Sequence, residues 1–160
     1  MPNKDWRCWR GCAAPTAVRA DPGTAVPDTD DIVISDQSDL IRVRQALRAQ
    51  ARSAGLGLVD ETKLITAGSE LARNILKYAT GARGRLRAEQ VAAGGRRGVR
   101  ATFTDEGPGI EDVGAALTDG FSTGGSLGLG LPGARRLVDE LTLTSAPGSG
   151  TTVVIEKWQR

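Results

Sequence analysis

Three short segments in a fixed order constrain this 160-residue chain more than any other feature of its sequence. ELARN spans Glu70–Asn74, DEGPGI spans Asp105–Ile110 and GGSLGLGLPG spans Gly124–Gly133. The first places a carboxylate and an amide four residues apart on a predicted helix, so both side chains share one face. The second places an aspartate among glycines after an apolar strand, and the third can wrap backbone amides around an anion. Together they predict a base, a metal ligand, an acid that reads a nucleotide base and a phosphate cradle, which are most of an ATP site.

Helix and turn signals between these segments predict the secondary structure. We expect Asp36 or Ser38 to cap a first helix that Gly55 and Gly57 end, and Asp60 to cap a second helix running to about residue 79. The second helix carries an apolar stripe of Leu64, Ile65, Ala67, Leu71, Ile75 and Tyr78. The other expected elements are strands at 32–34, 84–91, 99–103, 141–145 and 151–158 and a helix at about 130–140, with residues 111–124 irregular. Adjacent strand pairs with helices gathered elsewhere favour a two-layer α/β sandwich.

The first 29 residues differ in composition from the rest of the chain. Four prolines and scattered Gly, Asp and Thr predict a disordered or loosely docked tail at 1–29, followed by one domain at 30–160. Trp6 and Trp9 are the residues in the tail that could anchor it. Cys8 and Cys12 have no other Cys or His as partner, so incidental thiols are favoured over a redox pair or a metal half-site.

Several classes of function are excluded or disfavoured by composition. The chain has no histidine, so it cannot build a Ser-His-Asp triad, a His-ligated zinc site or a phosphohistidine relay by itself. A net charge of +2 gives no warrant for a nucleic-acid or membrane surface. No apolar run reaches membrane-spanning length and the N-terminus lacks the apolar stretch of a signal peptide, so we expect a soluble cytoplasmic protein.

The third segment also contains a formal G-x-G-x-x-G, made by Gly128, Gly130 and Gly133. A dinucleotide-binding fingerprint requires a preceding strand and an acid about 20 residues further on, and this chain has neither. A protein-kinase glycine loop requires an H-R-D catalytic loop, which a chain without histidine cannot have. What remains is a glycine loop entering a helix N-terminus, where free amides and the helix dipole favour phosphate. Pro132 in the first turn suits that geometry.

In this order and spacing, the three segments resemble the N, G1 and G2 boxes of the GHKL ATPase superfamily, which has the Bergerat fold. Gly150-Thr151 resembles the Gly-Thr pair near the end of that domain. Residues 67–74 (AGSELARN), residues 119–140 and the terminal EKWQR are most similar to the RsbT type, the serine/threonine switch kinases of the stressosome. This resemblance covers about residues 30–160 and implies a mixed, mostly antiparallel sheet with helices on one face.

The resemblance also implies roles for individual residues. Glu70 resembles the catalytic base, Asn74 the Mg2+ ligand and Asp105 the acid that reads adenine, while Thr151 supports Asp105, often through water. Residues 111–124 take the place of a short ATP lid. The remaining residues implied to contact the nucleotide are Gly107, Gly109, Ile110, Gly124, Gly125, Ser126, Leu127, Gly128, Leu129, Gly130 and Leu131.

The activity that this resemblance implies is transfer of the ATP γ-phosphoryl group to a Ser or Thr hydroxyl. The implied acceptors are a small STAS-domain antagonist protein and a related co-antagonist within a stressosome. The released kinase would then activate a PP2C-type phosphatase or another output. Three alternatives stay open: an anti-sigma factor kinase that binds a sigma factor directly, a non-catalytic ATP-dependent binding module, and a detached sensor-kinase domain acting on histidine in trans. Glu70 argues against the binding module, because binding alone requires no base.

Overall fold

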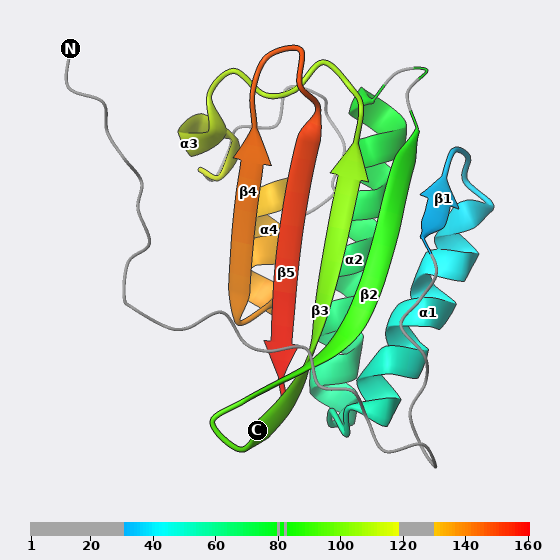
Figure 1. Cartoon of the computed structure of the whole chain (residues 1–160), viewed down its shortest axis with the longest axis vertical. Coiled ribbons are helices and arrows are strands. Elements are labelled where there is room, and N and C mark those ends of the chain that lie inside the picture. Colours follow the sequence, from blue (N-terminus) through cyan, green and yellow to red (C-terminus); the bar gives the residue numbers. More distant parts are fainter. Residues whose placement is uncertain (1–30, 80, 82, 119–129) are drawn as a thin grey trace.

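Five strands form a single antiparallel sheet in the computed structural model, which describes residues 31–79, 81, 83–118 and 130–160 (Figure 1). The strand order is β1-β2-β3-β5-β4, so the last strand in the sequence lies between β3 and β4. All four described pairings are antiparallel, so the sheet is not mixed. The strands are β1 (Ile32–Ile34), β2 (Gly84–Ala93), β3 (Arg96–Asp105), β4 (Glu140–Ser145) and β5 (Thr151–Trp158).

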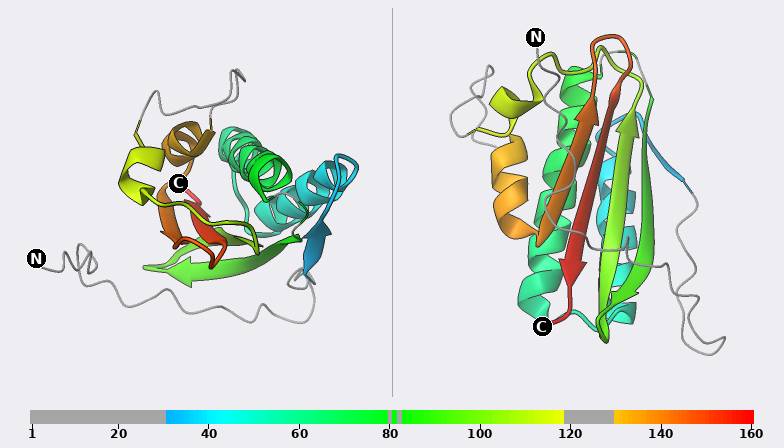
Figure 2. Two further views of the ribbon diagram at one scale, coloured as in Figure 1. Left: turned by 90° about the horizontal axis from the view of Figure 1, so that it is seen from above. Right: turned by 60° about the vertical axis from the view of Figure 1, so that its left-hand side comes forward.

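Three helices cover one face of this sheet, with α2 between α1 and α4 (Figure 2). These three helices are α1 (Asp39–Ser53), α2 (Leu58–Tyr78) and α4 (Gly130–Leu137), and a fourth, short helix, α3 (Val113–Ala116), contacts β4. This arrangement confirms the predicted two-layer α/β sandwich. Among the described residues, no helix is both long enough and apolar enough to cross a membrane.

The core lies between the sheet and α2. Strand residues alternate between the two faces, and Leu86, Phe103 and Ile155 are buried on the face that the helices cover. They meet the predicted apolar stripe of α2, most of which is buried. Gly68 allows α1 to pack closely against α2, because a Cβ at this position would collide with Leu47 of α1. Tyr78 is the exception to the predicted stripe: it is 48% exposed, because α2 ends there and its ring contacts the Lys77 ammonium instead.

The cap predicted for the first helix is right in position at Ser38, whereas the cap predicted for the second helix, Asp60, is wrong. Ser38 occupies the N-cap position of α1 without a side-chain hydrogen bond to the helix. Asp39, in the first turn, accepts hydrogen bonds from the backbone amides of Ser35 and Asp36 instead. The N-cap of α2 is Gly57, and Asp60 lies inside the first turn with its carboxylate 3.2 Å from the Lys157 ammonium. An acid in the first turn is favoured by the helix dipole as an N-cap acid is, so sequence alone does not separate the two positions.

Several element boundaries also differ from the sequence prediction. β2 and β3 extend to a two-residue turn at Gly94 and Gly95, whose φ angles of +57° and +77° suit a tight hairpin. Within the segment predicted to be irregular, α3 forms a single helical turn. α4 ends at Leu137, because β4 already begins at Glu140.

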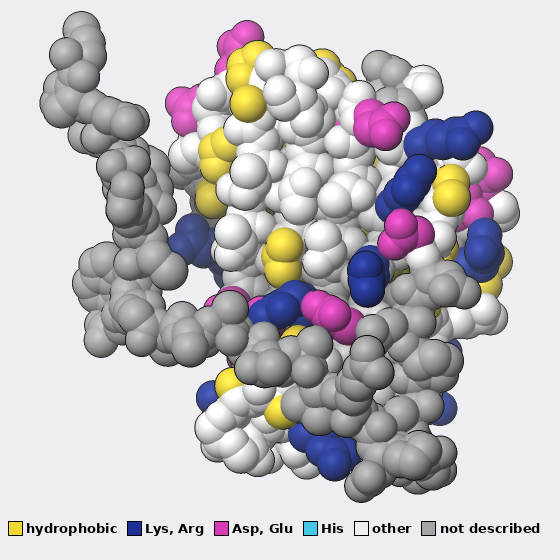
Figure 3. All heavy atoms as spheres, viewed as in Figure 1, with side chains coloured by type: hydrophobic (Ala, Val, Ile, Leu, Met, Phe, Trp, Pro, Cys, Tyr) yellow, Lys and Arg dark blue, Asp and Glu magenta, His cyan; other side chains and the backbone are white. Residues whose placement is uncertain are grey.

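The outer face of the sheet carries short, uncharged side chains over its middle (Figure 3). Thr144, Thr152 and Thr104 form one row across β4, β5 and β3, and Thr142, Val154 and Thr102 form the next. A polar outer face opposite an apolar inner face is typical of an antiparallel sheet with helices on one side. The predicted site residues that the structure describes are not on this outer face.

Candidate functional site

Elements from distant parts of the sequence meet at one end of the molecule, which we call the site end (Figure 1). β3 and β4 finish there, β5 and α4 begin there, and α2 runs towards it. Asp105, Thr151 and Ser145 are register partners across β3, β5 and β4, so their side chains share one face of the sheet. That face is the covered one, because Gly84, the partner of Asp105 on β2, packs against Ile75 of α2. The sheet therefore presents a row of three polar side chains to the space between its two layers.

The loop after Asp105 is fixed by close backbone contacts. Asp105 Oδ1 accepts a hydrogen bond from the Gly107 amide at 2.9 Å, and its other oxygen has no hydrogen-bond partner among the described residues. A Cβ on Gly107 would lie 2.9 Å from Ala79 Cα, at the end of α2. Gly109 has φ +77°, and a Cβ there would collide with the backbone oxygen of Ala146. At both glycines the protein's own backbone leaves no room for a Cβ.

Ser145 ties this loop to the turn between β4 and β5. Its hydroxyl accepts a hydrogen bond from the Ile110 amide at 2.8 Å and donates one to the Gly150 carbonyl, also at 2.8 Å. It also lies 2.9 Å from Thr151 Oγ1. The sequence prediction named Ile110 and Thr151 but missed Ser145. The available signal was a serine at a strand end, separated by Ala146 from the P-G-S-G turn.

Glu70 and Asn74 lie on the flank of α2 that faces away from α1. Ser69 marks the opposite flank, because it accepts a hydrogen bond from Arg44 of α1 at 3.1 Å. Glu70 is 8% exposed, and one of its oxygens is 2.6 Å from an Arg73 guanidinium nitrogen. Asn74 is half-buried, and its side chain has no hydrogen-bond partner among the described residues. The structure therefore places the predicted base and the predicted metal ligand on the side of α2 where α4 packs.

The sequence assigns no role to Arg73, Arg135 or Arg136, and the structure describes all three. Arg73 forms an ion pair with Glu70, the predicted base. Arg135 and Arg136 are exposed on the last turn of α4. Their distance along α4 from Gly130 puts them away from the start of that helix.

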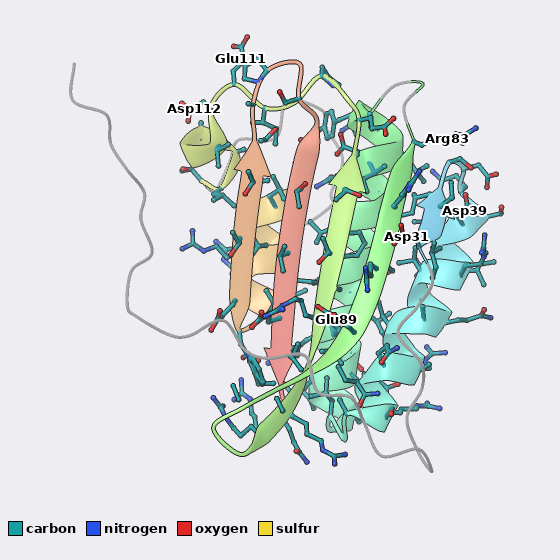
Figure 4. The ribbon with its side chains drawn as sticks, viewed as in Figure 1. Asp31, Asp39, Arg83, Glu89, Glu111 and Asp112 are labelled. Carbon is teal, nitrogen blue, oxygen red and sulfur yellow. The ribbon has the colours of Figure 1, made fainter. Side chains whose placement is uncertain are left out.

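Only part of the predicted phosphate segment falls within the described residues. The predictions for Gly124, Gly125, Ser126, Leu127, Gly128 and Leu129 lie outside them. Gly130, with φ +58°, and Leu131 are the first two residues of α4. Before this segment, Glu111 and Asp112 lie above the upper end of β4 (Figure 4), and Asp112 caps α3 by accepting a hydrogen bond from the Ala115 amide at 2.9 Å.

The described residues fit an adenine nucleotide with a divalent cation. Asp105 and Thr151 place hydrogen-bond acceptors on the face of the sheet that the helices cover. Asn74, on α2, has an uncharged amide oxygen that can ligate a cation. No group of three or more His, Cys, Asp or Glu in the described part of the chain is suited to a metal ion. A cation beside Asn74 would therefore take most of its oxygen ligands from phosphates and water, as Mg2+ commonly does.

Comparison with known proteins identifies the family. The family described as histidine kinase-, DNA gyrase B-, and HSP90-like ATPase matches residues 59–160, which run from the first turn of α2 through β5. The serine/threonine-protein kinase RsbT of Bacillus subtilis (strain 168) is 44% identical over 133 residues, which cover 83% of this chain and 98% of RsbT. The chain therefore belongs to the histidine kinase-, DNA gyrase B- and HSP90-like ATPases, an ATP-binding family, and within them it is an RsbT-like serine/threonine kinase.

Proposed function

We propose that this chain transfers the γ-phosphoryl group of ATP to Ser or Thr residues of STAS-domain antagonist and co-antagonist proteins of a stressosome. The observation that carries the proposal is the position of Glu70. It is nearly buried, one helical turn before Asn74, on the flank of α2 beside α4. A carboxylate held there can accept the proton of an attacking hydroxyl, a step that ATP binding alone does not require.

Each residue of the site has a distinct role in this proposal. Asp105 accepts a hydrogen bond from the exocyclic amine of adenine, and Asn74 holds Mg2+ through its amide oxygen. The backbone amides leading into α4 hold the phosphates, where the helix dipole favours negative charge. Glu70 takes the hydroxyl proton of the acceptor as the γ-phosphoryl group moves from the β-phosphate oxygen to the acceptor oxygen and ADP leaves. Bound Mg2+ supplies neutralisation of phosphate charge, which is a large part of catalysis in phosphoryl transfer.

The partners in this proposal follow from the similarity to RsbT. Phosphorylation of the antagonist releases the kinase, and the released kinase activates a PP2C-type phosphatase or another output protein. The 44% identity extends over 98% of RsbT, which supports shared partners. The competing proposal is that the kinase binds a sigma factor directly. A pull-down that offers both a sigma factor and a STAS-domain antagonist separates the two proposals.

Glu70→Gln tests the proposed base. Glutamine keeps the size of the side chain and a hydrogen-bonding oxygen for Arg73 but cannot take up a proton. With labelled ATP, Mg2+ and the STAS protein encoded nearby, we expect the rate of phosphoryl transfer to fall by about 100-fold or more. We expect the dissociation constant for ATP, measured by calorimetry, to change by less than about threefold, because removing a base acts on the chemical step rather than on binding.

Glu106→Gln is the matched control, because Glu106 is an exposed acid next to Asp105. We expect this variant to retain both activity and affinity. Undiminished phosphoryl transfer by the Glu70→Gln variant would show that Glu70 is not the base. Absence of transfer to the STAS protein by the unaltered chain, with ATP still bound, would refute the proposed acceptor.

A further inference from the structure

The hydroxyl of Ser145 has three hydrogen-bond partners, and their chemistry fixes the direction of each bond. A serine hydroxyl has one hydrogen and two lone pairs. The Gly150 carbonyl can only accept, so it takes the hydrogen, and the Ile110 amide can only donate, so it takes one lone pair. The third partner is Thr151 Oγ1 at 2.9 Å. Only a lone pair of Ser145 is left for that contact, so Thr151 is the donor.

This direction determines what Thr151 offers to its surroundings. Its single hydroxyl hydrogen is directed at Ser145, so only lone pairs remain on its other sides. Asp105 is the register partner of Thr151 on β3, and one of its carboxylate oxygens has no partner among the described residues. Carboxylate oxygens also accept hydrogen bonds. The Asp105–Thr151 pair is therefore a patch of acceptors on the covered face of the sheet.

We propose that Ser145 is a specificity-determining residue, which makes this site select a 6-amino purine nucleotide over a 6-oxo purine nucleotide by holding Thr151 as an acceptor. The inference rests on the proposed placement of the purine at Asp105. The amine at C6 of adenine offers two N–H donors, whereas inosine and guanine present a carbonyl oxygen at that position. A bridging water gives the same result, because donating both its hydrogens to Asp105 and Thr151 leaves it only lone pairs for the base.

The test compares dissociation constants for ATP and inosine triphosphate, which differ at the six-position, using the full chain with Mg2+. We expect the unaltered protein to bind ATP at least about tenfold more tightly, since a carbonyl facing acceptors goes unpaired. In Ser145→Ala, Thr151 loses its acceptor and its hydrogen can turn towards the base. We expect inosine triphosphate to bind Ser145→Ala more tightly than it binds the unaltered protein. We expect the preference for ATP over inosine triphosphate to shrink by about fivefold or more.

Thr151 variants test the same inference without touching Ser145, should that substitution disturb folding. Thr151→Ser keeps the hydroxyl that donates to Ser145, so we expect the ATP preference to be unchanged. Thr151→Val removes the hydroxyl, so we expect a weaker preference but no gain in affinity for inosine triphosphate. Ser149→Ala is the control in the same turn, because Ser149 is exposed and its side chain has no hydrogen bond in the described part of the chain.

An equal loss of affinity for both nucleotides in Ser145→Ala would overturn the inference, because it would show that Ser145 only holds the loop. A Thr151→Val variant with the full ATP preference would overturn it as well, as would an unaltered protein that binds both nucleotides equally. These measurements need no phosphoryl acceptor. If the unaltered protein prefers ATP as expected but transfers no phosphoryl group to a STAS protein, the proposed acceptor is refuted and this inference stands.

Discussion

Individual residues at the site end are constrained by neighbours that leave little room for change. Gly109 has a positive φ and contacts the backbone of Ala146, across the turn between β4 and β5. Gly148 N also donates a hydrogen bond to the Pro108 carbonyl at 2.8 Å. The loop that carries Asp105 and the turn before Thr151 are therefore joined backbone to backbone, so a change at one residue affects both sides of the proposed adenine site.

Gly109→Ala should destabilise the protein and weaken ATP binding together. The left-handed conformation alone costs an alanine roughly 1–2 kcal/mol, and the collision with Ala146 adds to that cost. We expect the free energy of unfolding in urea to fall by at least about 2 kcal/mol. Gly148→Ala is the matched control, because Gly148 has φ +75° and open space where its Cβ would lie. Equal losses in the two variants would contradict the importance of the Ala146 contact.

The sequence predicted those residues whose role depends on their own motif. Glu70, Asn74 and Asp105 could be named because their spacing and glycine neighbours are local. Their roles stay predictions, and the structure places Asp105 at the end of β3 and the other two on α2. Ser145 was not identified, because its partner Ile110 is 35 residues away and the contact depends on how β4, β5 and β3 come into register. The sequence could not predict the ion pair of Arg73 with Glu70 either, since an exposed arginine on a helix has many possible partners.

At the scale of elements, a buried lysine joins three parts of the fold at the end opposite the site. Lys157 on β5 is 1% exposed, and its ammonium lies 3.2 Å from Asp60 in the first turn of α2. It also lies 3.0 Å from Asp139, between α4 and β4, and Asp139 accepts a hydrogen bond from the Trp158 amide. The sequence could not predict this cluster, because it read Asp60 as a cap and Lys157 as part of a terminal strand.

Lys157→Met should show how strongly this cluster holds the elements together. Methionine fills a similar volume but leaves Asp60 and Asp139 without their buried partner. We expect the free energy of unfolding to fall by about 3–5 kcal/mol, the usual cost of breaking a buried ion pair. Lys63→Met, on the same α2 helix but with no ion pair among the described residues, should change it by less than about 0.5 kcal/mol. A loss below 1 kcal/mol for Lys157→Met would contradict a structural role.

At the scale of the whole molecule, the lowered pKa values of two carboxylates, Asp39 and Asp139, predict how the free energy of unfolding depends on pH. The backbone hydrogen bond from Ser35, with a second from Asp36, lowers the pKa of Asp39 below its ordinary 3.8 despite burial. Burial by itself would raise the pKa of Asp139, but the Trp158 amide and the Lys157 ammonium outweigh it, so this pKa is also below 3.8. Each carboxylate therefore releases its proton more readily in the folded protein than in the unfolded chain.

Acid should therefore destabilise the fold through both residues. With a lowered folded-state pKa, the stabilisation is fully present above the unfolded-state value of 3.8 and is lost as the pH falls through the folded-state value. We expect the free energy of unfolding to decline below about pH 4.5, and the decline to be shallower in Asp39→Asn and Asp139→Asn. Urea titrations between pH 3 and 7 measure it. A variant whose slope matches that of the unaltered protein would exclude its carboxylate as a contributor.

The position of β5 inside the sheet has a consequence for synthesis. A ribosome makes β3 and β4 before β5, yet the sheet order separates those two strands by β5. The nascent chain therefore has a gap in its sheet until residues 151–158 have emerged. Asp105 gains its neighbour Thr151 only then, so the row proposed to select the nucleotide is completed only after β5 has been made. The order of assembly thus keeps a partly made chain from acquiring the complete proposed adenine site.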